Sequence, residues 1–89
     1  MTTCELQIIN KLGLHARAAA KLVKLSSSFA SNIHIEKEGQ CVNSKSIMGV
    51  MMLAASCGSS VTLRAEGVDE AESIKAIVDL INRRFDEDE

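Results

Sequence analysis

Aromatic residues are almost absent from this 89-residue sequence, and proline is absent altogether. Phe29 and Phe85 are its only aromatic residues, and there is no tryptophan or tyrosine. A core built from this chain must therefore consist of aliphatic side chains. The shortage of rings also argues against the stacking surfaces on which proteins bind single-stranded nucleic acid.

Motifs of metal sites, disulfide frameworks and membrane spans are missing as well. Cys4, Cys41 and Cys57 form no CxxC pair and no metal-site spacing, and their odd number fits reduced thiols. No signal peptide is visible, and no apolar run reaches the roughly 20 residues of a membrane span. We therefore expect a cytoplasmic protein without membrane insertion, bound metal or cofactor.

Charge is distributed unevenly along the chain. Residues 6–35 contain four basic residues and no acidic one, a second acid-free window spans residues 39–65, and residues 86–89 are all acidic. The positive windows favour an acidic partner or a phosphoryl group, or they are solvated faces. Their charge is too small and too scattered for a nucleic-acid-binding protein. We expect one domain over residues 1–85, followed by an acidic tail, 86–89, that is a disordered solubility element.

Hydrophobic periodicity predicts seven elements. Alternation with period two indicates strands, and apolar spacing of three and four indicates helices. The expected order is strand 4–9, helix 16–27, strand 33–37, strand 41–43, a short helix from 47 that Gly58 stops, strand 60–66, and helix 70–84 capped by Asp69. Four strands with helices on one face make a two-layer α+β domain, a plan that several unrelated families share.

The segment "GLHARAAAKLV", residues 13–23, starts a helix without a small capping side chain. His15 stands in the capping position, and Arg17 follows two residues later. A helix start offers free N–H groups and a positive dipole end to an anion, and imidazole is a nucleophile near neutral pH. His15 can thus accept a phosphoryl group that the backbone of Ala16 and Arg17 and the Arg17 guanidinium would bind. Taken alone this motif is weak, and a surface histidine at the end of a loop is the simpler interpretation.

A second helix start lies at Ser46, next to Lys45. The simplest interpretation of Ser46 is an ordinary N-cap, although a phosphate there would also meet a helix dipole. Four large apolar residues follow too closely for one short helix to bury them all: Ile47, Met48, Met51 and Met52. Some of them should form an exposed patch, which would suit adaptable partner binding. The other histidine, His34, takes an outward strand position and is expected to be ordinary surface.

Together, the two segments resemble HPr, the histidine-containing phosphocarrier family of the bacterial sugar phosphotransferase system. "GLHARAAAKLV" resembles the active-site segment of that family, and "VNSKSIMGVMMLAAS" resembles its regulatory-serine segment. The resemblance runs from about residue 4 to residue 85, and two motifs in register are far more specific than one. It implies an open-faced sandwich of four antiparallel strands with three helices on one face.

The resemblance also implies a phosphoryl carrier that is not an enzyme. His15 would take a phosphoryl group at Nδ1 from Enzyme I, which draws it from phosphoenolpyruvate, and would pass it to IIA-type acceptors. Arg17 would steady that group, and Ser46 would be the target of an HPr kinase/phosphorylase. The residues expected to bind partners are Lys24, Lys45, Ile47, Met48 and Met51.

One residue departs from the family, which usually has proline where this chain has Ala18. Alanine restores a backbone donor and loosens the constraint on φ, so phosphate geometry and hydrolysis rate can differ. Two alternatives stay open: a nitrogen-related phosphocarrier, against which the intact "SKSIMG" segment argues, and a non-catalytic binding module of the same plan. No sequence feature calls for a stable oligomer, so we expect a monomer.

Overall fold

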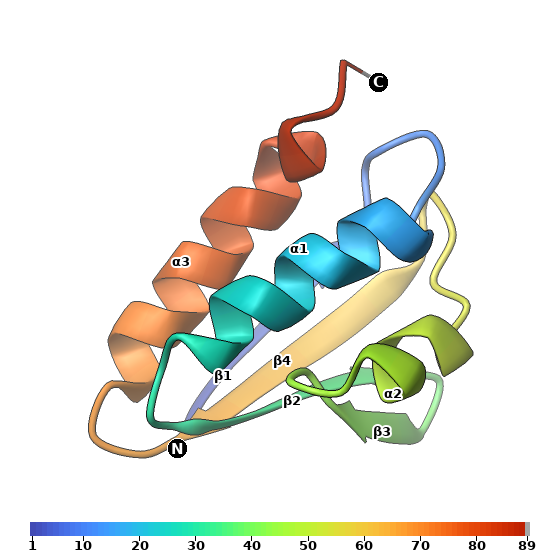
Figure 1. The fold of residues 1–89 in the computed structure, drawn as a ribbon. Helices are drawn as coiled ribbons and strands as arrows, with labels where there is room; N and C mark the ends of the chain where they lie inside the picture. Colours follow the sequence, from blue (N-terminus) through green and yellow to red (C-terminus); the bar gives the residue numbers. More distant parts are fainter. Residues whose placement is uncertain (89) are drawn as a thin grey trace.

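The sheet contains four strands whose spatial order differs from their order in the sequence (Figure 1). In the computed structural model, which describes residues 1–88, the strands are β1 (Thr2–Gln7), β2 (Asn32–Lys37), β3 (Gln40–Asn43) and β4 (Ser60–Glu66). Every neighbouring pair is antiparallel, and the order across the sheet is β1-β4-β2-β3. The last strand therefore lies between the first two and joins them into one sheet.

Helices cover one face of this sheet and leave the other face open (Figure 1). They are α1 (Ala16–Ser27), α2 (Ile47–Met52), α3 (Glu70–Asn82) and the short 3-10 helix η1 (Arg84–Asp86). The expected open-faced α+β sandwich is confirmed. Among the helices described over residues 1–88, none is long and apolar enough to cross a membrane.

The core between the layers is aliphatic, as the composition requires. The inward positions of β4, Val61, Leu63 and Ala65, are buried as the alternation predicts. On α3, Ser73 and Leu80 are buried together with three isoleucines, whereas Ala71 is exposed. Phe85 is fully buried at the end of the helical layer. One aromatic ring thus completes a core of branched aliphatic side chains.

The second helix ends earlier than expected. We predicted that Gly58 would stop it, but α2 ends at Met52 and Ala54 takes a left-handed φ of 52°. The reason is burial: Leu53 and Ala55 both reach the core while Ala54 between them is exposed, an arrangement that a continuing α-helix would not give. The ammonium group of Lys37 donates hydrogen bonds to the carbonyl groups of Leu53 and Ala54 and satisfies this helix end.

Asp69 stands at the N-cap of α3, but its side chain does not cap that helix. Instead the carboxylate accepts hydrogen bonds from the N–H groups of Ala30 and Ser31, both at 2.9 Å, and from the Ser31 hydroxyl. The hydroxyl and then the Ala30 N–H hold the pKa of Asp69 below its usual value. The predicted cap is therefore wrong, because the carboxylate ties the loop after α1 to the start of α3.

A close backbone approach at Gly13 sets the path of the chain into α1. Gly13 has a φ of +66°, and a Cβ atom there would lie 2.5 Å from the Ala55 oxygen and 2.8 Å from the Ser56 Cα. The adjacent Leu14 N–H donates to the same Ala55 oxygen at 2.8 Å. The absence of a side chain at Gly13 thus lets the loop before α1 lie against the segment after α2.

Replacement of Gly13 by alanine should test this approach against a matched control. Gly39 is also left-handed, with a φ of +83°, but a Cβ there would meet nothing within 4 Å. We expect Gly39→Ala to lower the free energy of unfolding by about 1–2 kcal/mol, because it pays only for the backbone conformation. Gly13→Ala adds a clash and should cost roughly 2–5 kcal/mol. Urea unfolding measures both, and equal losses would show that the close approach contributes nothing.

Candidate functional site

His15 occupies the N-cap position of α1 at the end of the loop that follows β1. Its backbone is extended, and its carbonyl accepts the N–H of Ala19 at 2.8 Å, but its side chain forms no capping hydrogen bond. The N–H groups of residues 16–18 therefore have no partner within the helix. No acidic residue of α1 itself stands in its first turn, where the positive end of the helix dipole lies.

A pocket of about 340 Å³ adjoins this helix start and is lined by Lys11, Leu12, Arg17 and Glu87. Arg17 is exposed and, within residues 1–88, forms no hydrogen bond that would hold its guanidinium elsewhere. Two cationic residues and one carboxylate thus meet at the pocket. Sequence reasoning pointed to His15 and Arg17 at this helix start; the structure adds the carboxylate of Glu87, which lines the pocket and contacts His15.

The carboxylate of Glu87 contacts the imidazole of His15 directly. Its Oε2 atom lies 2.5 Å from Nε2 of His15, and the two side chains are 14% and 27% exposed. Its Oε1 atom accepts a hydrogen bond of 2.9 Å from Nδ2 of Asn10. The hydrogen bond from Asn10, followed by that from His15, holds the pKa of the Glu87 carboxyl below its usual value. The expected disordered tail is therefore wrong for Glu87, while Glu89 lies outside the described residues.

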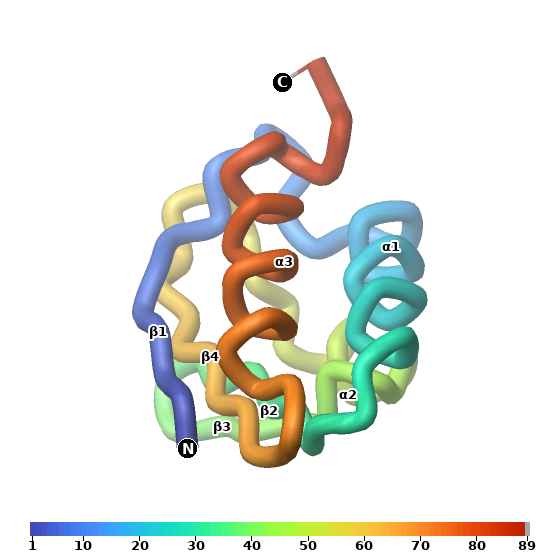
Figure 2. The backbone as a smooth tube through the Cα atoms, turned by 90° about the vertical axis from the view of Figure 1, so that its left-hand side faces the viewer, coloured from blue at the N-terminus to red at the C-terminus, as the bar shows by residue number. Residues whose placement is uncertain are grey.

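A turn after α3 brings this carboxylate back to α1. Arg84, Phe85 and Asp86 all have left-handed backbone conformations, with φ of 57°, 54° and 63°. Phe85 is buried, and its carbonyl accepts a hydrogen bond of 2.7 Å from the ammonium of Lys21 on α1. Figures 1 and 2 show the C-terminal segment, the loop before α1 and the start of α1 at the same end of the molecule.

Asn10 is the second residue of the candidate site, after Glu87, to which sequence reasoning did not point. It is fully buried, and its Nδ2 atom donates both to Glu87 and to the carbonyl of Gly13 at 2.8 Å. Its Oδ1 atom is buried without a partner among the described residues. A single asparagine in a loop carries no sequence signal, because its role depends on a partner 77 residues away.

Ser46 and the apolar residues behind it form a second cluster beside the same loop. Ser46 is the N-cap of α2, and its Oγ accepts the N–H of Gly49 at 3.2 Å. The exposed side chains of α2 are Ile47 (40%), Met48 (69%), Met51 (45%) and Met52 (66%). The expectation that one short helix cannot bury them all is met. We call these four residues the α2 patch; the segment that follows them contacts Leu14, the neighbour of His15.

Lys24 and Lys45, the two lysines expected to bind partners, have their contacts outside the α2 patch. The ammonium of Lys45 donates a hydrogen bond of 2.8 Å to the carbonyl of Phe29. Lys24 lines a groove of about 410 Å³ between α1 and α3, to which α2 contributes no residue. A role of either lysine in docking remains a prediction.

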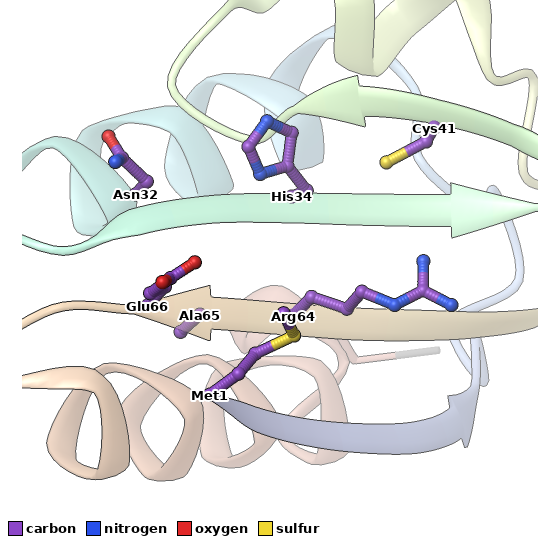
Figure 3. Close-up of a pocket in the computed structure, with 7 residues that line it drawn as sticks. All are labelled: Met1, Asn32, His34, Cys41, Arg64, Ala65 and Glu66. Carbon is purple, nitrogen blue, oxygen red and sulfur yellow. The ribbon is translucent and has the colours of Figure 1, made fainter.

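His34 lies on the open face of the sheet, away from the helices (Figure 3). It is exposed, as its outward strand position predicts. The shallow hollow around it, of about 330 Å³, is lined by Met1, Asn32, His34, Cys41, Arg64, Ala65 and Glu66. Over residues 1–88, no three histidine, cysteine or acidic side chains are grouped closely enough to hold a metal ion. The two histidines therefore belong to opposite layers of the molecule.

Comparison with known proteins places these features in a family. The family model described as "PTS HPr component phosphorylation site" matches residues 2–83. The phosphocarrier protein HPr of Cupriavidus necator is 56% identical over 82 residues, with 92% of each chain covered. The crystal structure of HPr-C-His from Thermoanaerobacter tengcongensis has a TM-score of 0.97 and 52% identity over all of both chains. A structure titled as an HPr dimer from the same organism has a TM-score of 0.79 and 53% identity, covering 98% of this chain and 100% of that one.

Proposed function

This chain belongs to the HPr family of phosphocarriers of the phosphotransferase system, and we propose that His15 is the residue that carries its phosphoryl group. One observation carries the proposal: His15 stands at a helix start whose N–H groups are free, beside a pocket lined by Lys11 and Arg17. A histidine needed only for capping would bond to that helix start. His15 forms no such bond, and its Nε2 contacts Glu87, so Nδ1 is the ring nitrogen that remains available for chemistry.

The phosphoryl group would come from Enzyme I, which takes it from phosphoenolpyruvate, and would pass to an IIA-type acceptor. Its transfer to Nδ1 of His15 would bring the phosphoryl oxygens to the N–H groups of Ala16 and Arg17. The helix dipole would favour the dianion by about 0.3–1 kcal/mol. The guanidinium of Arg17 would add paired donors to the same oxygens. Ala18 leaves its own N–H free in this turn, where a family proline would have none.

The α2 patch would provide the apolar part of the docking surface for these partners. Methionine side chains adapt to different surfaces, which suits a carrier that meets a donor and several acceptors. Ser46, at the start of the same helix, would be the target of an HPr kinase/phosphorylase. We also propose that transfer occurs in the cytoplasm and that the monomer is the transferring form, since one chain supplies every residue of the site.

His15→Ala should abolish phosphorylation by Enzyme I and phosphoenolpyruvate, whereas His34→Ala should leave it intact. The reason is position: His34 lies on the open sheet face, in the layer without helices. Intact mass measures phosphorylation of each variant after incubation, and acid lability identifies a phosphohistidine. A phosphoryl group that persists in His15→Ala would refute the assignment.

Arg17→Ala should slow phosphoryl transfer by about tenfold or more, because it removes a charged donor from the developing phosphate. Its melting temperature should hardly change, since the side chain is exposed in a first turn. Lys75→Ala on α3 is the charge-matched control, because Lys75 is exposed and does not line the pocket. An unaltered rate for Arg17→Ala would place the guanidinium away from the phosphate.

Phosphate on Ser46 should inhibit phosphorylation of His15 by about tenfold or more at low salt. It adds about −1.5 to −2 charges at pH 7 beside Met48 and so places a hydrated anion in the α2 patch. Kinase-treated chain, Ser46→Asp and Ser46→Ala can be compared at two salt concentrations. We expect weaker inhibition from aspartate, none in kinase-treated Ser46→Ala, and less inhibition at high salt. Equal rates for treated and untreated chain would leave Ser46 a plain N-cap.

A further inference from the structure

Glu87 lies beyond residues 2–83, which the family model matches, yet it contacts the proposed phosphoryl acceptor. We propose that Glu87 is a positioning residue: its carboxylate holds the His15 ring with the proton on Nε2 and thereby presents Nδ1 as the nucleophile. This inference deepens the proposed function and rests on it. It assigns a task to a residue that the sequence marks only as part of an acidic run.

The proton on Nε2 follows from the chemistry of the contact. Glu87 is ionised near neutral pH, since its pKa lies below the usual value, and an ionised carboxylate can only accept hydrogen bonds. At 2.5 Å from Oε2, Nε2 of His15 must therefore be the donor. In the neutral ring one nitrogen carries the proton and the other carries the lone pair. The lone pair is then on Nδ1.

The carboxylate is held on both of its oxygens. Oε2 accepts from His15, and Oε1 accepts from Asn10, which is fully buried and also bonded to the Gly13 carbonyl. The same loop that ends at His15 therefore supplies the group that orients its partner. A carboxylate that holds a histidine in one tautomer commonly tunes the ring's reactivity in this way.

The backbone before Glu87 shows that this placement is built into the fold. Three successive residues, 84–86, have left-handed conformations, which are unfavourable for any residue with a side chain. Such conformations persist only where the surroundings hold them. Burial of the Phe85 ring and the hydrogen bond from Lys21 to its carbonyl hold this turn. The turn thereby places Glu87 against the start of α1.

The transfer step explains what Glu87 would stabilise. The Nδ1 lone pair forms the bond to phosphorus while the bond from phosphorus to the donor breaks, and that electron pair leaves with the donor. Because Nε2 keeps its proton, the ring gains a positive charge as the new bond forms. The carboxylate of Glu87 faces that charge. When the phosphoryl group passes to the next acceptor, the electron pair of the bond to phosphorus returns to Nδ1 and the ring is neutral again.

The first test is spectroscopic and needs no phosphoryl transfer. Correlation spectra of ¹H and ¹⁵N in the imidazole rings show whether a proton on Nε2 is protected from exchange with water. We expect a protected Nε2 proton for His15 in the native chain and in Asp88→Asn, and its loss in Glu87→Ala. The exposed ring of His34 serves as the internal reference in every spectrum. A His15 ring that looks the same in Glu87→Ala would overturn the proposal.

The second test is the rate of phosphorylation by Enzyme I and phosphoenolpyruvate. Glu87→Ala should lower the rate at saturating carrier by about tenfold or more, with little change in KM. Glu87→Gln keeps an acceptor oxygen but loses the charge, so its rate should fall between those of the native chain and Glu87→Ala. Asp88→Asn removes a charge from the next, exposed residue and should leave the rate unchanged. A rate for Glu87→Ala that is unchanged or faster would show that the carboxylate does not assist transfer.

The two proposals fail in different ways. If the native chain takes no phosphoryl group at His15, the proposed function fails and this inference fails with it. If the native chain is phosphorylated at His15 and Glu87→Ala is phosphorylated as fast, only the role of Glu87 fails. Unchanged melting of Glu87→Ala would confirm that a slower rate reflects the site and not the fold.

Discussion

The close contact between the loop before α1 and the segment after α2 is the constraint on which the site depends. Gly13 has no side chain, so the backbone at Ala55 and Ser56 can approach it, and the N–H of Leu14 bonds to Ala55. This contact determines where α1 begins and hence where His15 stands. It also ties the segment that follows the α2 patch to Leu14, the neighbour of His15, so one contact positions both the proposed acceptor and the proposed docking surface.

The site combines opposite charges around one ring. Free N–H groups at the start of α1 and the cations Lys11 and Arg17 favour an anion, and Glu87, which lines the same pocket, contacts Nε2 of the ring. In the proposed phosphorylated state the phosphoryl group would carry negative charge, and the imidazole ring, with its proton kept on Nε2, would be positive. The arrangement would offer each of these charges a partner of opposite sign.

Within the described residues, the acidic run at the end of the chain has fixed contacts, because Glu87 is bonded to the rest of the domain. The chain turns after α3, buries Phe85 and is tied by Lys21, so that Glu87 meets His15 and Asn10. A run of like charges is normally solvated and without fixed contacts. Here the buried side chain of Phe85, directly before the run, holds the chain in place so that Glu87 keeps fixed contacts.

Local periodicity determined the elements, the two-layer α+β plan, the position of His15 at a helix start and the exposed residues of α2. These features depend on neighbours a few residues apart, so their signal is contained in short segments. Only the tertiary structure decided that α2 ends at Met52, that Asp69 bonds to the loop after α1, and that Glu87 lies against His15. Each of those outcomes depends on groups that are distant in the chain, 72 residues apart for Glu87 and His15, and that meet only when the two layers pack.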